Sequence, residues 1–107
     1  MNTISDICNN IKINTESRKK RNDNDASPLL RSFKFFDLKE EGYLSFNDFL
    51  KSLERIGIIP DSKNYSVFKE LFSNYNINNN FNYTEFIIDL YPINIKNLDI
   101  KNLYFKY

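Results

Sequence analysis

The sequence predicts an all-α fold in which two helix–loop–helix units pack as a pair, with an N-terminal helix before them and an apolar tail after them. Apolar residues recur at helical spacing in segments between residues 28 and 92, and short polar stretches separate these segments. The two units also repeat. Leu44 and Phe81 lie 37 residues apart, and so do Phe49 and Phe86.

Composition limits the classes of function. The chain has 107 residues, which suits one small domain, and its formal net charge of +1 offers no bulk field to attract nucleic acid or an anionic membrane. There is no His and one Cys, Cys8, so neither a Cys–His or Ser–His catalytic pair nor a zinc site rich in His or Cys can form within this chain. The paired carboxylates Glu40 and Glu41 are interpreted as loop surface. We therefore expect no enzyme and no small-molecule substrate.

Three features indicate a cytoplasmic location. No apolar run approaches the roughly 18 residues of a membrane span. The first residues lack the basic start and continuous apolar core of a signal peptide. A single cysteine fits a reducing compartment.

Residues 1–13 predict a short amphipathic helix, which Thr3 can cap. Its apolar stripe consists of Ile4, Ile7, Cys8 and Ile11. Because so short a helix is marginal alone, it must dock on something. Two interpretations remain open: it packs on its own domain, or it anchors a partner protein through Ile4, Ile7 and Ile11.

Residues 14–27 predict a linker, because they are polar, charged and without periodicity. Within them, the basic run 17–21 is followed by Asp23 and Asp25. This run is interpreted as a solvated segment or as a phosphate-binding patch.

The first unit of the pair spans residues 28–57. Ser27 suits the cap of its first helix and Pro28 the first helical position. A polar loop of residues 37–48 follows, in which Ser45 and Asp48 resemble a capping box for the next helix. Gly57 then ends that helix.

The second unit spans residues 62–91. Asp61 or Ser62 is the predicted cap of its first helix, an Asn-rich turn covers 76–80, and Asn82 begins the last helix. A short strand contact between Leu44 and Phe81 is expected to tie the two loops. The inward-facing rings are either plain core or the lining of a groove for an amphipathic helix; they are Phe33, Phe36, Phe49, Phe68, Phe72 and Phe86.

The unit 28–57 resembles an EF-hand, and the segment 28–92 resembles an EF-hand pair with degenerate loops. The residues that fit loop positions 1, 5, 6, 8 and 9 are Asp37, Glu41, Gly42, Leu44 and Ser45. The calcium ligands that the resemblance implies are Asp37, Glu41, Tyr43 (through its carbonyl), Ser45 and Asp48.

The same loops depart from the calcium-binding pattern. Lys39 stands at position 3, where a ligand oxygen is needed, and the short Asp48 stands at position 12. The second loop has neutral asparagines, no glycine and about ten residues instead of 12. We therefore expect no cofactor, with calcium at the first loop as the alternative.

The resemblance extends to myosin essential light chains and to calcyphosine-like axonemal EF-hand proteins. It implies a non-catalytic structural subunit that binds a protein partner, either an amphipathic helix or a cytoskeletal protein such as myosin or the tubulin lattice, largely without calcium. The implied location is the cytoskeleton, with the flagellar axoneme as one example. The alternative is a calcium sensor that uses the first hand.

Residues 93–107 form an apolar tail. One interpretation folds it back over the pair. The other makes it a docking tail that a partner buries, because a polar module would not leave so many rings exposed. The expected partner contacts in the tail are Leu103, Tyr104 and Phe105.

Overall fold

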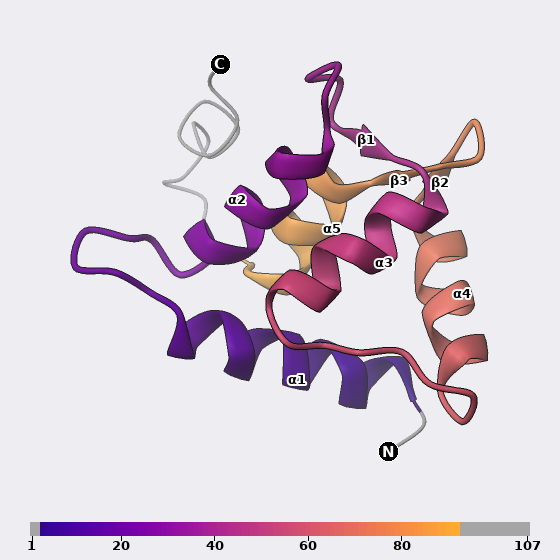
Figure 1. Ribbon diagram of the computed structural model, residues 1–107, viewed down its shortest axis with the longest axis horizontal. Coiled ribbons are helices and arrows are strands. Elements are labelled where there is room, and N and C mark those ends of the chain that lie inside the picture. Colours follow the sequence, from indigo (N-terminus) through magenta and orange to yellow (C-terminus); the bar gives the residue numbers. More distant parts are fainter. Residues whose placement is uncertain (1–2, 93–107) are drawn as a thin grey trace.

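A computed structural model describes residues 3–92 of the chain (Figure 1). The elements in order are α1 (Ile4–Ser17), α2 (Ser27–Phe36), β1 (Tyr43–Leu44), α3 (Phe46–Arg55), α4 (Tyr65–Asn74), β2 (Asn76–Ile77), β3 (Asn80–Asn82) and α5 (Tyr83–Leu90). The small sheet joins the two loops at one side of the molecule, and α1 lies across the other side, beneath α2 and α3 in the view of Figure 1.

The all-α prediction is wrong. Over the described residues the five helices are accompanied by an antiparallel sheet of three strands in the order β1–β3–β2. The difference arises in the second loop, where Asn76 pairs with Phe81 and Ile77 pairs with Asn80. What was predicted as an Asn-rich turn is thus a β-hairpin.

Two asparagines close this hairpin. Asn78 and Asn79 have φ angles of +51° and +67°. A two-residue hairpin turn of the favoured twist needs positive φ at both central residues, and Asn adopts that region more readily than other non-glycine residues. The asparagines that were compared with calcium ligands therefore serve a turn.

Replacing Asn79 tests this account. Asn79→Gly is expected to raise the free energy of unfolding by about 0.5 kcal/mol, because Asn-Gly is the preferred sequence of this turn. Asn79→Ala is expected to lower it by about 1 kcal/mol, because Ala lacks the short polar side chain that lets Asn adopt positive φ. The two variants differ only at Cβ, so equal urea midpoints would contradict the turn.

Other local predictions are confirmed. Leu44 pairs with Phe81 across β1 and β3. The Thr3 hydroxyl accepts the Asp6 N–H at 3.1 Å at the start of α1. Gly57, with φ of +85°, follows α3. The predicted caps at Ser27 and at Asp61 or Ser62 are wrong, because Ala26 precedes α2, which begins at Ser27 itself, and helix α4 begins at Tyr65.

The N-terminal helix is longer than predicted and the linker is shorter. Helix α1 continues to Ser17 because its buried stripe extends one turn further, to Thr15. The Thr15 hydroxyl donates a hydrogen bond to the Ile11 carbonyl at 2.7 Å, so its burial leaves no unpaired donor. The segment 18–26 is then an ordered connection. Arg31 holds Asp23 through two hydrogen bonds of 2.8 and 2.9 Å, and these bonds hold the pKa of the Asp23 carboxyl well below its usual range.

The core confirms most of the predicted inward rings. Phe33, Phe49, Phe68 and Phe86 are buried, whereas Phe36 and Phe72 are partly exposed at its margin. Phe81 and Tyr83, both fully buried, complete the core and were not among the predicted rings. These rings fill the interior of the pair.

The described part of the chain, residues 3–92, contains no helix that is both long and apolar enough to cross a membrane.

Candidate functional site

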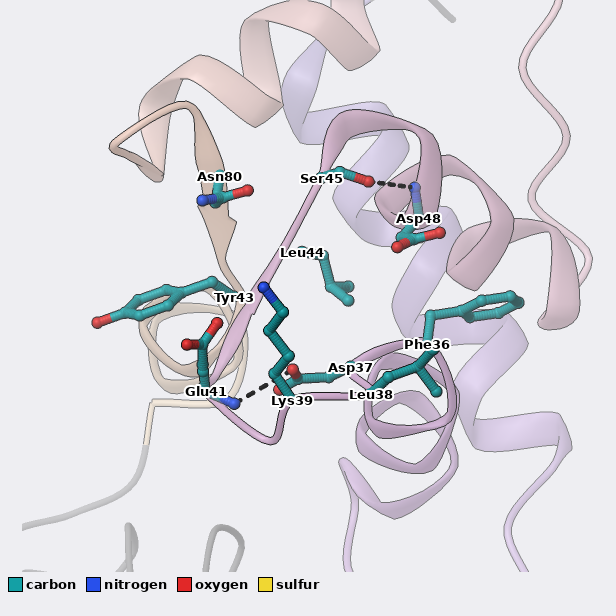
Figure 2. Close-up of a pocket in the computed structure, with 10 residues that line it drawn as sticks. All are labelled: Phe36, Asp37, Leu38, Lys39, Glu41, Tyr43, Leu44, Ser45, Asp48 and Asn80. Atoms are coloured by element: carbon teal, nitrogen blue, oxygen red, sulfur yellow. Dashed lines mark hydrogen bonds between the residues drawn. The ribbon is translucent and has the colours of Figure 1, made fainter.

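The first loop surrounds a pocket of about 310 Å³ between α2, β1 and α3 (Figure 2). All five predicted calcium-ligand residues line it: Asp37, Glu41, Tyr43, Ser45 and Asp48. The fold therefore brings together the residues that the sequence pattern selected. Whether these residues could bind a metal ion depends on which of their oxygens already accept hydrogen bonds from the protein.

Asp37 follows the last residue of α2, and its side chain turns into the loop. The residue is 5 % exposed. Its carboxylate accepts the backbone N–H of Glu41 at 3.2 Å and that of Gly42 at 2.8 Å. Gly42 can present this N–H because its φ of +83° lies in the region that favours glycine.

Tyr83 supplies a further donor to the same carboxylate from the second unit. Its hydroxyl donates to Asp37 Oδ2 at 2.7 Å, and both groups are buried. A buried carboxylate is stable only when its oxygens are compensated, and these donors provide that compensation within the protein. The loop is thus closed around Asp37 by protein groups.

The remaining predicted ligands have other surroundings. The Ser45 hydroxyl accepts the Asp48 N–H at 3.2 Å and caps α3, as the capping pattern predicted. Tyr43, whose backbone carbonyl is the predicted ligand, pairs with Asn82 in the sheet. Glu41 is exposed at the loop surface.

Lys39 adds a positive charge to the pocket. It lines the same space as Asp37 and Asp48, and Figure 2 shows its side chain extended from the loop toward β1. A cation and an ammonium group in one small pocket repel each other. Lys39 therefore opposes the binding of a metal ion.

Two features of the pocket weigh against a calcium ion, the hydrogen bonds of Asp37 and the charge of Lys39. Within residues 3–92, no group of three or more Asp, Glu, Cys or His side chains is placed to hold a metal ion. Calcium requires six to eight oxygen ligands, and here Asp37 is already bonded and Lys39 intrudes. The first loop thus has the sequence pattern of a calcium-binding loop, but hydrogen bonds within the protein organise it.

In the second loop one candidate side-chain oxygen is already used by the protein. The Asn76 side-chain oxygen accepts the Asn79 N–H at 3.1 Å within the hairpin. Its amide thus belongs to the turn.

Sequence reasoning missed the role of Tyr83, although a signal was present. Tyr83 stands 37 residues after Phe46, the same interval that relates Leu44 to Phe81. The second unit thus carries a hydroxyl where the first carries none. A buried Tyr needs a hydrogen-bond partner, and an unmatched hydroxyl between two repeated units points to a contact across the pair.

The partner contacts predicted at the N-terminus need correction. Ile7 is 4 % and Ile11 is 0 % exposed, because both pack into the core of this chain. Ile4 is partly buried against the same core. Of the two interpretations of this helix, the structure shows packing on its own domain. The other predicted contacts, Leu103, Tyr104 and Phe105, lie outside the described residues.

Comparison of the chain with models of protein families, with curated proteins and with solved structures returns no match.

Proposed function

We propose that this protein is a non-catalytic, EF-hand-like interaction module that holds a protein partner without using calcium. The observation that carries the proposal is the hydrogen bond between Tyr83 and Asp37, at 2.7 Å. This bond supplies a protein donor to the carboxylate of Asp37, the first residue of the loop that resembles a calcium-binding loop.

The consequence for switching is direct. A calcium switch needs a loop whose arrangement differs with and without the ion. Here the first loop is joined to the second by the Tyr83–Asp37 bond and by the β1–β3 pairing. Asp37 Oδ2 already accepts the Gly42 N–H and the Tyr83 hydroxyl, so an ion bound to this atom would compete with the Tyr83 bond.

The cytoskeletal part of the proposal rests on the resemblance to light chains and axonemal EF-hand proteins. Its supporting features are the degenerate loops and the apolar flanking segments. A helix of a motor protein or a component of the microtubule lattice is the proposed partner, and the cytoskeleton is the proposed location.

A calcium titration of the full chain, followed by amide NMR and started in chelator, tests the proposal. The Gly42 amide is the direct reporter, since its N–H donates to Asp37. We expect no saturable shift up to about 1 mM calcium, because Lys39 repels a cation in this pocket and the Asp37 carboxylate is already hydrogen-bonded. Saturable shifts at Gly42 below about 10 μM, the range of sensor sites, would instead establish a calcium sensor that uses the first hand.

A further inference from the structure

The described chain ends against helix α1. Tyr91 follows α5, and its N–H donates to the Ile87 carbonyl at 2.9 Å. Its ring lies beneath Lys12 of α1, with the Lys12 Nζ atom 5.7 Å from the ring centroid. Pro92, the next residue, lines a pocket together with Cys8 of α1. The chain therefore leaves the described fold at the seam between α1 and α5.

The pocket at this seam has a volume of about 240 Å³. Its apolar wall consists of Cys8 from α1, of Phe86 and Leu90 from α5, and of Pro92. An apolar cavity of about 150 Å³ already holds a molecule of the size of benzene. The pocket at the seam thus has room for an aliphatic side chain.

The polar groups around the pocket have partners within the protein. The Tyr75 hydroxyl donates to Asp89 Oδ2 at 2.8 Å, and burial together with this bond raises the pKa of Tyr75. Lys12 is placed over the ring of Tyr91. Burial raises the pKa of the Cys8 thiol, so this group is neutral at pH 7 and contributes an apolar surface. The pocket is therefore suited to an apolar group.

The sequence supplies such groups immediately after Pro92, at Ile93 and Ile95. An extended chain spans at most about 3.6 Å per residue, so the backbone of Ile95 stays within about 11 Å of Pro92. A group held by so short a connection has an effective concentration in the millimolar range or above. Both isoleucines are thus kept beside a pocket that aliphatic side chains can fill.

We infer that residues 93–95 turn back over the pocket between α1 and α5 and cover it with the side chains of Ile93 and Ile95. In an extended chain, residues two apart lie on one side, so both isoleucines can face the pocket while Asn94 faces water. The contact fastens α1 to the end of α5. It does not rest on the proposed function, because the partner contacts proposed in the tail, Leu103, Tyr104 and Phe105, lie further along the chain.

The accessibility of Cys8 in the full chain tests the inference. Cys8 is the single cysteine of the chain, so labelling by a maleimide reports on this pocket alone. Replacing Ile93 and Ile95 together by asparagine is expected to raise the labelling rate about tenfold, because the thiol becomes exposed. Asparagine adds no charge that would alter the pKa of Cys8. The matched control is Leu103→Asn with Phe105→Asn, which should leave the rate unchanged.

A second readout needs no polar substitution at the pocket. Ile95→Cys and Asn94→Cys are compared with oxidised glutathione as the oxidant, which takes the two hydrogens of the thiols and becomes two glutathione molecules. A disulfide with Cys8 requires Cβ atoms about 3.5–4.5 Å apart. Mass spectrometry of the intact chain is expected to show this disulfide in most Ile95→Cys molecules and in few Asn94→Cys molecules.

An unchanged labelling rate in the double asparagine variant would overturn the inference. Equal disulfide yields at positions 94 and 95 would overturn it even if that variant labels faster, because a loosened fold also exposes the thiol. Protection of Cys8 that increases with protein concentration would show that a second copy covers the pocket instead. The calcium titration reports on Gly42, in the first loop, so either result can fail while the other stands.

Discussion

Replacing Phe81 with alanine is expected to lower the free energy of unfolding by about 4 kcal/mol, because the change leaves a cavity at the centre of the core. Phe81 is fully buried in the central strand, opposite Leu44. Among the described residues five rings surround it, with centroids 4.3 to 5.9 Å away: Phe33, Phe49, Phe72, Tyr75 and Phe86. Its loss therefore loosens both units at once.

Urea unfolding followed by circular dichroism measures this effect. Small domains have a total stability of about 5–15 kcal/mol, so Phe81→Ala removes a large part of it and a milder substitution is measured beside it. Phe81→Leu keeps most of the volume and is expected to lower the stability by about 1 to 2 kcal/mol. Phe35→Ala is the control, because Phe35 is 58 % exposed beside Arg55. A Phe35→Ala loss as large as that of Phe81→Leu would contradict the central place of Phe81.

Replacing Tyr83 with phenylalanine is expected to lower the free energy of unfolding by about 2 kcal/mol, because it removes a hydrogen bond to a buried carboxylate and keeps the ring. The ring still stacks on Phe33, with centroids 5.2 Å apart, so the change isolates the hydroxyl. Tyr43→Phe is the matched control. Its ring is partly exposed beside the same loop, and an exposed substitution of this kind should change stability by less than about 0.5 kcal/mol.

The same substitution has a second expected result in a background altered for calcium. Lys39→Asp with Asp48→Glu supplies the ligand types that positions 3 and 12 of the loop require. Adding Tyr83→Phe to this pair should tighten calcium binding further, because it releases Asp37 Oδ2. Isothermal titration calorimetry compares the double and triple variants. Identical affinities would mean that the Tyr83 hydroxyl does not compete with the ion.

Local signals in the sequence predicted local structure well. Ser45 caps α3, Gly57 follows it with positive φ, and Leu44 faces Phe81 at the predicted strand contact. These features depend on residues that are neighbours along the chain or that stand at equivalent positions of two repeated units. The repeat also placed the five candidate ligands around one pocket, where the Asp37 carboxylate and the Ser45 hydroxyl already accept hydrogen bonds from the protein.

The Asn-rich turn predicted at residues 76–80 is present at Asn78 and Asn79, but the two strands that it joins were not predicted. Its asparagines suit a ligand loop, a turn and a helix cap equally well by type. The segment forms a hairpin because Asn78 and Asn79 adopt positive φ, which allows β2 to pair with β3. A pattern of side-chain oxygens does not report the backbone angle of the residue that carries them.

The sequence by itself determined the paired helix–loop–helix units, the caps at Thr3 and Ser45 and the contact between the two loops, because each follows from periodicity, from capping chemistry or from the internal repeat. Only the tertiary structure decided two further points. It placed α1 in the groove of the pair instead of on a partner, because a short apolar stripe does not say which surface will cover it. It also gave Asp37 to the hydroxyl of Tyr83, since the residue that compensates a buried charge is chosen by proximity in space, across 46 positions of the chain.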